Sequence, residues 1–345
     1  MTSPKRGSKY VLPNNRYEQL VQQVTTAGCF ERTYFSHGLL LLSSLLGLTA
    51  SAYMITYSDN TWLQVGNAVV AAFFSVQLGL FGHDLSHQSV FPSKKLNKNL
   101  ALIIWGLGCG LSESRWFYKH NAHHQSPNHI DHDPDLDIPF VFTAEQAATR
   151  SDFSKKYILP YQHILFWVGV MFVYPFNLLH SMRFLIEKYS WRSLIEIILI
   201  SGHFLIVLIF TFSQLPFLTA VIFNLVTLLT IGIYMGLIFA PNHKGEDMLS
   251  STEKHNWVHQ ITLTRNLHHS PIGSYVLGGL DFQVEHHLFP SMSRFKYSAA
   301  HTIVISFCTK HNIPYKEVSF SESMKQIHQA LHEESRSWRQ KTKPC

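Results

Sequence analysis

Histidines are the residues of this sequence whose type and spacing point most clearly to chemistry. The chain of 345 residues contains 22 histidines, and several lie in three short motifs: GHDLSH at 82–87, HNAHH at 120–124 and QVEHH at 283–287. A spacing of three or four residues places imidazoles on one face of a helix, where they can share a metal ion. The histidines of these motifs are His83, His87, His120, His123, His124, His286 and His287. They are too many for one zinc ion, which takes four ligands, so they favour a site with two metal ions.

Apolar segments are the elements that must position these motifs. Four runs approach the length of about 20 apolar residues that crosses a bilayer; they are residues 39–56, 65–82, 194–212 and 217–239. They contain no Lys, Arg or Asp, and Glu196 lies at the edge of the third. We therefore predict four transmembrane helices, with buried helices of a large soluble protein as the alternative. Two shorter stretches, 100–111 and 163–179, are interrupted by polar residues, Gly or Pro, and we expect them to be interfacial or re-entrant.

Charge predicts the orientation of the spans. The links YSDNTW and SQLP within the two hairpins carry no Lys or Arg, whereas the polar segments 83–192 and 243–345 are rich in both. By the positive-inside rule both hairpins return to the cytoplasm, so all three histidine motifs leave the membrane on the same side. The net charge of +6 fits a protein that lies against anionic lipid. The basic residues form no tract of the kind that binds nucleic acid.

The metal and its chemistry follow from context. Imidazole binds iron, copper, zinc and nickel, so the ligand type alone leaves the metal open. Two metal ions at a membrane face indicate oxidation of a lipid chain with O2. A metal transporter is the alternative from another class. Transporters place ionisable residues inside their spans, and these apolar runs are nearly free of them.

The three motifs, with the longer stretch GGLDFQVEHHLFP, resemble the histidine boxes of the membrane fatty acid desaturases. The glutamine that leads the third box is similar to that of the acyl-lipid and front-end branch. The resemblance covers about residues 60–310. It implies an all-α integral membrane fold in which four transmembrane helices carry a cytosolic helical cap, 83–192 and 243–345, in one domain over 1–345. The implied reaction is O2-dependent introduction of a double bond into a fatty acyl chain at a di-iron centre.

Carried over to this sequence, the resemblance makes all the histidines of the three motifs iron ligands and adds His243 from the stretch APNHKG. Asn242 is a candidate for holding a metal-bound water. Gln283 departs from the all-histidine pattern, and either ligates weakly or orients a ligand. Asp84 and Glu285 each accept a hydrogen bond from a ligating ring or are solvated helix carboxylates. We expect the acidic run HIDHDPDLDIPF, 129–140, to be a surface loop broken by proline, with a role beside the metal ligands or in docking as the alternative.

Electrons for the reaction must come from elsewhere. The sequence has neither a GxGxxG unit for a flavin or nicotinamide nor the His-Pro-Gly-Gly motif of a haem-binding cytochrome b5 domain. We expect a separate donor, cytochrome b5 or a ferredoxin. The expected substrate is an acyl lipid or acyl-CoA, in the bacterial inner membrane or the endoplasmic reticulum. A lipid hydroxylase on the same scaffold remains the nearest alternative, because the histidine motifs do not separate oxygen insertion from desaturation.

Overall fold

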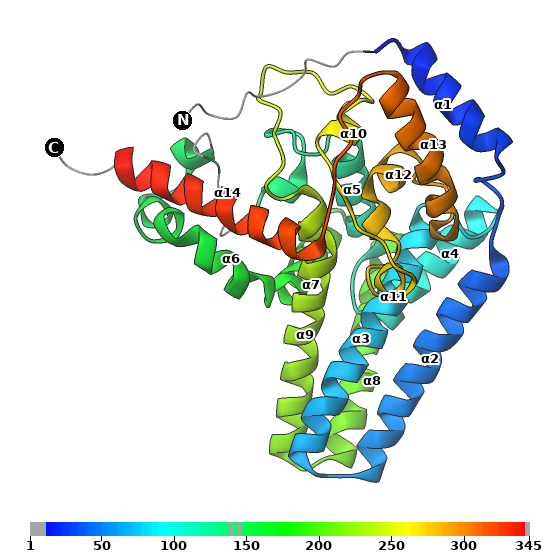
Figure 1. Ribbon diagram of the computed structural model, residues 1–345. Coiled ribbons are helices and arrows are strands. Elements are labelled where there is room, and N and C mark those ends of the chain that lie inside the picture. The colour runs from blue at the N-terminus through cyan, green and yellow to red at the C-terminus, as the bar shows by residue number, and fades with distance from the viewer. Residues whose placement is uncertain (1–11, 139–140, 142, 144–145, 342–345) are drawn as a thin grey trace. The chain divides into compact units, whose positions relative to one another are not determined.

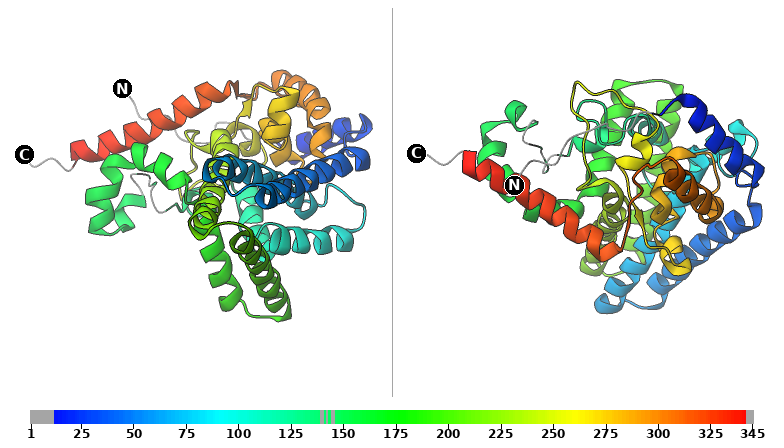
Figure 2. Two further views of the ribbon diagram at one scale, coloured as in Figure 1. Left: turned by 90° about the horizontal axis from the view of Figure 1, so that it is seen from below. Right: turned by 45° about the horizontal axis from the view of Figure 1, so that its top comes forward.

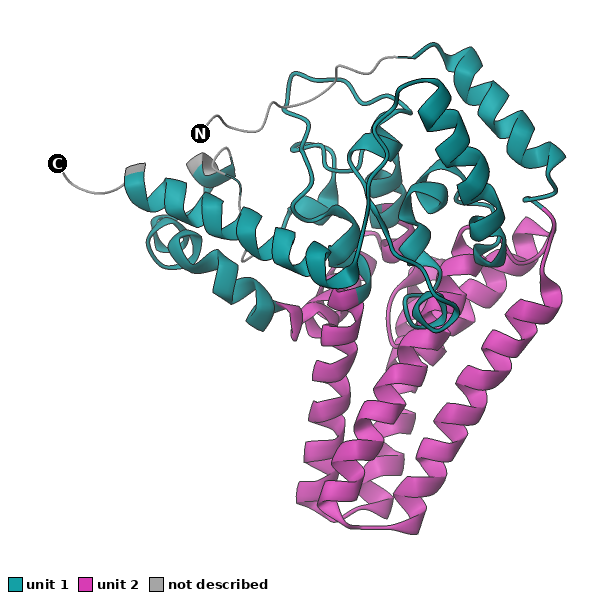
Figure 3. Ribbon diagram, viewed as in Figure 1, with its two compact units in different colours: residues 1–30, 119–169, 238–345 teal, residues 31–118, 170–237 magenta. Residues whose placement is uncertain are grey.

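The computed structural model describes residues 12–138, 141, 143 and 146–341. The chain forms two compact units (Figure 3). Unit 1 contains residues 1–30, 119–169 and 238–345, and unit 2 contains residues 31–118 and 170–237.

Four long apolar helices dominate unit 2 and run alongside one another in Figure 1. They are α2 (Tyr34–Tyr57), α3 (Thr61–Ser86), α8 (Trp191–Gln214) and α9 (Phe217–His243), of which α9 continues into unit 1 after residue 237. All four are long and apolar enough to cross a membrane, as the sequence predicted, and the bent pair Ser154–Val170 and Val173–Glu187 would add a fifth span if it crossed as one. Each helix is longer than its apolar run because polar residues extend the ends. A hydrogen bond of 2.8 Å between the Thr61 and Thr219 hydroxyls joins the first turns of α3 and α9.

Shorter helices complete unit 2. The stretch 100–111 ends α4 (Lys94–Ile103) and then forms a π-helical turn, η1 (Ile104–Gly108), which packs on α8 at Leu199. The stretch 163–179 is divided between α6 (Gln162–Val170) and α7 (Val173–Glu187), with a break at residues 171 and 172. Neither stretch forms one straight helix, as the interruptions in the sequence predicted.

Unit 1 has its hydrophobic core between α1 (Asn14–Thr26) and α13 (Tyr297–Lys310), which lie alongside each other in Figures 1 and 2. Leu20 and Val24 of α1 are fully buried against Val304 and other apolar residues of this core. The same core covers α12 (Gln283–Leu288), and the Tyr17 hydroxyl donates to the carbonyl of Leu288 over 2.8 Å. The helix that carries the third histidine motif is thus held in place by its contacts with this core and with α1.

The carboxy-terminal helix α14 (Phe320–Lys341) lies beside α6 (Figure 2). One face of this helix, with Ile327, Leu331 and Ser335, is buried. The only strands among the described residues are β1 (Asn266–Leu267) and β2 (Glu317–Val318), which pair in parallel. The remaining elements are α5 (Glu113–Gln125), η2 (Pro134–Leu136), η3 (Gln146–Thr149), η4 (Ser154–Ile158), η5 (Leu159–Tyr161), α10 (His259–Thr262), α11 (Pro271–Val276), η6 (Leu280–Phe282) and η7 (Arg294–Lys296).

Candidate metal site

Unit 1 brings together candidate ligands that are far apart in the sequence. The end of α5, the last turn of α9 and the short helix α12 converge, and they carry His120, His123, His124, His243, His286 and His287. The predicted spacing on a helix is confirmed for the second motif, because the rings of His120 and His124 lie 4.5 Å apart.

One group of rings is centred on His243. Its Nε2 atom lies 3.3 Å from Nε2 of His123 and 3.1 Å from Nε2 of His287. All three side chains are buried, and their nitrogens lie within 4.8 Å of one another, so they can hold one metal ion.

A second group is centred on His124. Its Nε2 atom lies 3.0 Å from Nε2 of His120 and 3.0 Å from Nε2 of His286. The ring of His124 also stacks on that of His287, with centroids 4.3 Å apart and an interplanar angle of 19°. This stack links the second group to the group around His243.

The hydrogen bonds of the outer ring nitrogens, Nδ1, decide whether the inner nitrogens, Nε2, carry a lone pair that can bind a metal ion. Nδ1 of His287 lies 2.9 Å from the side-chain amide oxygen of Gln260, which only accepts hydrogen bonds, and Nδ1 of His123 lies 2.9 Å from the carboxylate of Asp133. In a neutral imidazole a proton on Nδ1 leaves a lone pair on Nε2. Lone pairs that face one another at about 3 Å repel unless a cation lies between them, and so the donor set fits a bound metal ion.

Asp133 holds His123, which is the role that the sequence analysis gave only as the alternative for the acidic run. Its buried carboxylate accepts from Nδ1 of His123 at 2.9 and 3.0 Å, from the backbone N–H of Asn128 at 2.7 Å and from that of Asp135 at 2.8 Å. The expectation of a surface loop is therefore wrong at this position. The signal was present, because the acidic run follows the second motif directly. Burial lowers the pKa of His123, but the carboxylates of Asp133 and Asp135 outweigh this effect, and the pKa is raised.

Gln283 and Asn242 lie against His243. The amide nitrogen of Gln283 is 2.8 Å from Nε2 of His243, and its oxygen accepts from Nδ2 of Asn242 over 3.1 Å. Asn242 also donates to the carbonyl of Leu280 over 2.9 Å. Both amides are buried beside the candidate ligand His243.

The first motif lies in unit 2, at the end of α3. The rings of His83 and His87 are 4.6 Å apart, and Trp116 packs edge-on against both at 5.3 and 6.0 Å. Asp84 is 4% exposed, so it is not a solvated carboxylate. Its oxygens lie 3.7 Å from Nδ1 of His83 and 3.4 Å from Nε2 of His37. Its carboxylate therefore lies between His83 of the first motif and His37.

Comparison with known proteins identifies the family. The family model described as "Fatty acid desaturase" matches residues 60–319. The Delta(8)-fatty-acid desaturase of Borago officinalis is 28% identical over 89% of this chain and 72% of its own length. The acyl-lipid (9-3)-desaturase of Physcomitrium patens is 28% identical over 88% and 59%, and the Delta(6)-fatty-acid desaturase of Caenorhabditis elegans is 29% identical over 87% and 70%. The chain belongs to the fatty acid desaturase family. It is an integral membrane oxidoreductase whose reaction is fatty acyl desaturation.

Arg265 fixes the end of α9 in this desaturase, and sequence reasoning missed it. Its fully buried guanidinium donates to the carbonyls of Pro241, over 2.6 Å, and of Lys244. It also donates to the carboxylate of Glu246 over 2.9 Å and to the amide oxygen of Gln326 over 2.8 Å. The last carbonyls of a helix have no partner within the helix. Arg265 satisfies that of Pro241 and also binds the carbonyl of Lys244 just beyond the helix, and so holds the turn that carries the candidate ligand His243.

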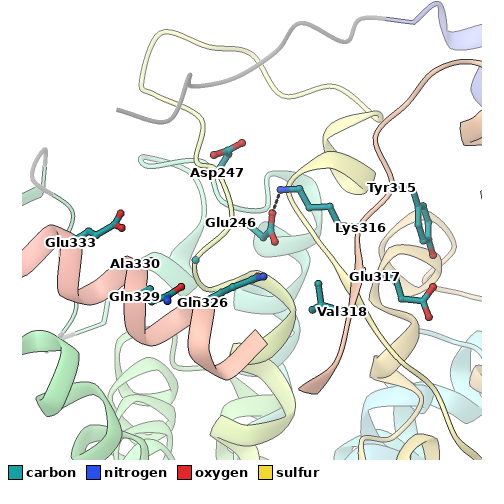
Figure 4. Close-up of a pocket in the computed structure, with 11 residues that line it drawn as sticks. Glu246, Asp247, Tyr315, Lys316, Glu317, Val318, Gln326, Gln329, Ala330 and Glu333 are labelled. Carbon is teal, nitrogen blue, oxygen red and sulfur yellow. Dashed lines mark hydrogen bonds and ion pairs between the residues drawn. The ribbon is translucent and has the colours of Figure 1, made fainter. Parts of the chain in front are cut away.

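A groove of about 490 Å³ lies beside Glu246, the carboxylate that pairs with Arg265. Figure 4 shows Glu246 and Lys316 paired at its wall. The groove is lined by Gly245, Glu246, Asp247, Tyr315, Lys316, Glu317, Val318, Gln326, Gln329, Ala330 and Glu333. None of the candidate metal ligands lines it, so it is separate from the histidine cluster.

Proposed function

We propose that this chain introduces a double bond into a fatty acyl chain at two iron ions. The proposed ligands are His83, His87, His120, His123, His124, His243, His286 and His287. The observation that supports the proposal best is the convergence of Nε2 atoms, 3.0–3.3 Å apart, in unit 1. For the first motif the support is the sequence spacing and the pairing of the His83 and His87 rings in unit 2.

The chemistry explains why metal ions are needed. A methylene group has no acidic proton, so side chains alone cannot remove its hydrogens, and two irons with O2 supply the oxidising power when bound. Each turnover reduces one O2 to two waters with two hydrogens of the substrate, two electrons and two protons. Among the residues of the chain, Asp133 and Gln260 hold imidazoles with the Nε2 lone pair directed inward. Asp84, Asn242 and Gln283 act beside the ligands.

The electrons come from a separate donor, cytochrome b5 or a ferredoxin, and the substrate is an acyl lipid or acyl-CoA. Both hairpins return to the cytoplasm in this proposal, so the histidines lie at the cytoplasmic face. The basic composition of the segments 83–192 and 243–345 supports that orientation. We treat the two compact units as one catalytic domain over 1–345.

Expression in a host that lacks the activity tests the proposal. Mass spectrometry of the lipids should locate one new double bond, and the purified protein should contain two irons per chain. For a variant that removes a proposed ligand, such as His124→Ala, the matched control is His328→Ala, because His328 is an exposed histidine of α14 outside the cluster. A hydroxylated lipid without a new double bond would refute desaturation in favour of the hydroxylase. A protein that desaturates without bound iron would refute the metal assignment.

A further inference from the structure

Glu285 lies inside the third histidine motif, yet its carboxylate touches none of the ligating rings. The side chain is completely buried and therefore is not a solvated helix carboxylate. Nor does it accept from the neighbouring His286, whose Nδ1 atom lies 3.0 Å from the Tyr297 hydroxyl instead. Both sequence-based interpretations of Glu285 are thus wrong. A buried charge is costly unless it is paired or hydrogen-bonded, so its partners indicate its role.

The partners of Glu285 come from distant parts of unit 1. Nδ2 of Asn266 donates to one carboxylate oxygen over 2.7 Å, and the hydroxyl of Tyr315 donates to the other over 2.8 Å. Nδ1 of His301 lies 3.3 Å from the second oxygen. The carboxylate thereby joins α12 to β1, to α13 and to the segment before β2.

The short strand pair explains how Asn266 and Tyr315 meet. The backbone N–H of Asn266 donates to the carbonyl of Lys316 over 2.9 Å at the start of the parallel pairing of β1 with β2. Asn266 also accepts from the backbone N–H of Val284 over 2.8 Å, on the first turn of α12. Asn266 therefore contacts α12 at two points, the backbone N–H of Val284 and the carboxylate of Glu285.

Helix α12 needs such contacts because it has only six residues. Isolated helices shorter than about 12 residues are marginal in water, so the place of this helix is set by its surroundings. We propose that Glu285, held by Asn266 and Tyr315, is a positioning residue that sets where His286 and His287 present their nitrogens to the metal ions. The inference rests on the proposed function, because it assigns those two histidines as ligands.

An exchange of donor and acceptor tests the proposal. In Glu285→Gln the new NH2 group faces either the amide nitrogen of Asn266, where two donors oppose each other, or the Tyr315 hydroxyl, which donates at that position in the wild type; either orientation removes one hydrogen bond accepted by the carboxylate. In Asn266→Asp two carboxylates oppose each other instead. The double variant restores a donor opposite an acceptor, and the introduced aspartate still accepts from the backbone N–H of Val284. Rescue in the double variant is therefore specific to this contact.

The measurements are iron per chain and the rate of iron loss to a chelator, made on the full-length detergent-purified protein. Changes in the partners of metal ligands typically weaken metal binding about 10- to 100-fold. We expect about tenfold faster iron loss in each single variant and a return towards the wild-type rate in the double variant. Glu333→Gln, at an exposed carboxylate of α14, is the matched control and should leave the rate unchanged.

Two results would overturn the proposal: single variants that lose iron at the wild-type rate, or a folded double variant that loses it as fast as the single ones. If the single variants fail to accumulate, Tyr315→Phe removes one donor but keeps the ring, and an unchanged rate of iron loss in it would also refute the idea. Wild-type protein without iron would refute the proposed function itself, which separates the two failures.

Discussion

Asp133→Asn should weaken iron binding although the carboxylate is not a proposed ligand. The side chain is buried, and each of its oxygens accepts from His123 and from one backbone N–H, of Asn128 or of Asp135. An amide has only one acceptor oxygen. In either orientation its NH2 group faces a backbone N–H, at 2.7 or 2.8 Å in the native contact.

The magnitude follows from these contacts. A hydrogen bond to a charged group contributes about 1.5–3 kcal/mol, and a buried donor left unpaired costs about 1–3 kcal/mol. We therefore expect the free energy of unfolding to fall by about 2.5–6 kcal/mol. The remaining amide oxygen still lies within reach of Nδ1 of His123 but carries no full negative charge, so it holds the proton on Nδ1 more weakly. Mutation of such a partner typically costs about 10- to 100-fold in metal affinity.

The assay compares iron per chain, the rate of iron loss to a chelator and the thermal midpoint of unfolding. Asp131→Asn is the matched control, because Asp131 is an exposed carboxylate in the same loop. Its iron content and midpoint should equal those of the wild type. If Asp133→Asn keeps its iron as firmly as Asp131→Asn does, then the carboxylate does not orient His123 for a metal, and the argument from outer nitrogens fails.

Three further variants test other parts of the structure. His124→Ala should lose iron and activity but remain in the membrane, as iron analysis and membrane fractionation can show; persistent activity would refute the ligand assignment. Arg265→Lys should lower the free energy of unfolding by about 1–3 kcal/mol, because a lysine cannot satisfy both the helix carbonyls and Glu246; an unchanged thermal midpoint would contradict this role. Gly110→Ala should destabilise by about 1–2 kcal/mol, because φ is +65° there and the new Cβ would lie 2.7 Å from the ring of His203; unaltered thermal unfolding would contradict the strain.

The features that the sequence predicts are those encoded in contiguous segments. Apolar runs define the four long helices, because a bilayer span requires unbroken apolar length. The spacing of the second motif predicts the adjacent rings of His120 and His124, because helix geometry fixes that neighbourhood. Membership of the desaturase family follows from the same motifs.

The features that the sequence does not predict depend on contacts between distant segments. Asp133 looks like a loop carboxylate until the backbone turns so that Asn128 and Asp135 both donate to it. Arg265 looks like an isolated cation, and its contact with the end of α9 arises only in the folded chain. Local propensity carries no information about such pairs, and their geometry follows from tertiary packing.

In the proposed di-iron site, the stack of His124 on His287 has a consequence for the order in which iron ions enter. The two imidazoles lie face to face at 4.3 Å, so neither group can shift without disturbing the other. An ion captured by one group immobilises rings that border the second, which lowers the entropy lost when the next ion arrives. Loading is therefore expected to be cooperative, and protein with a single iron should be scarce at every stage of a titration.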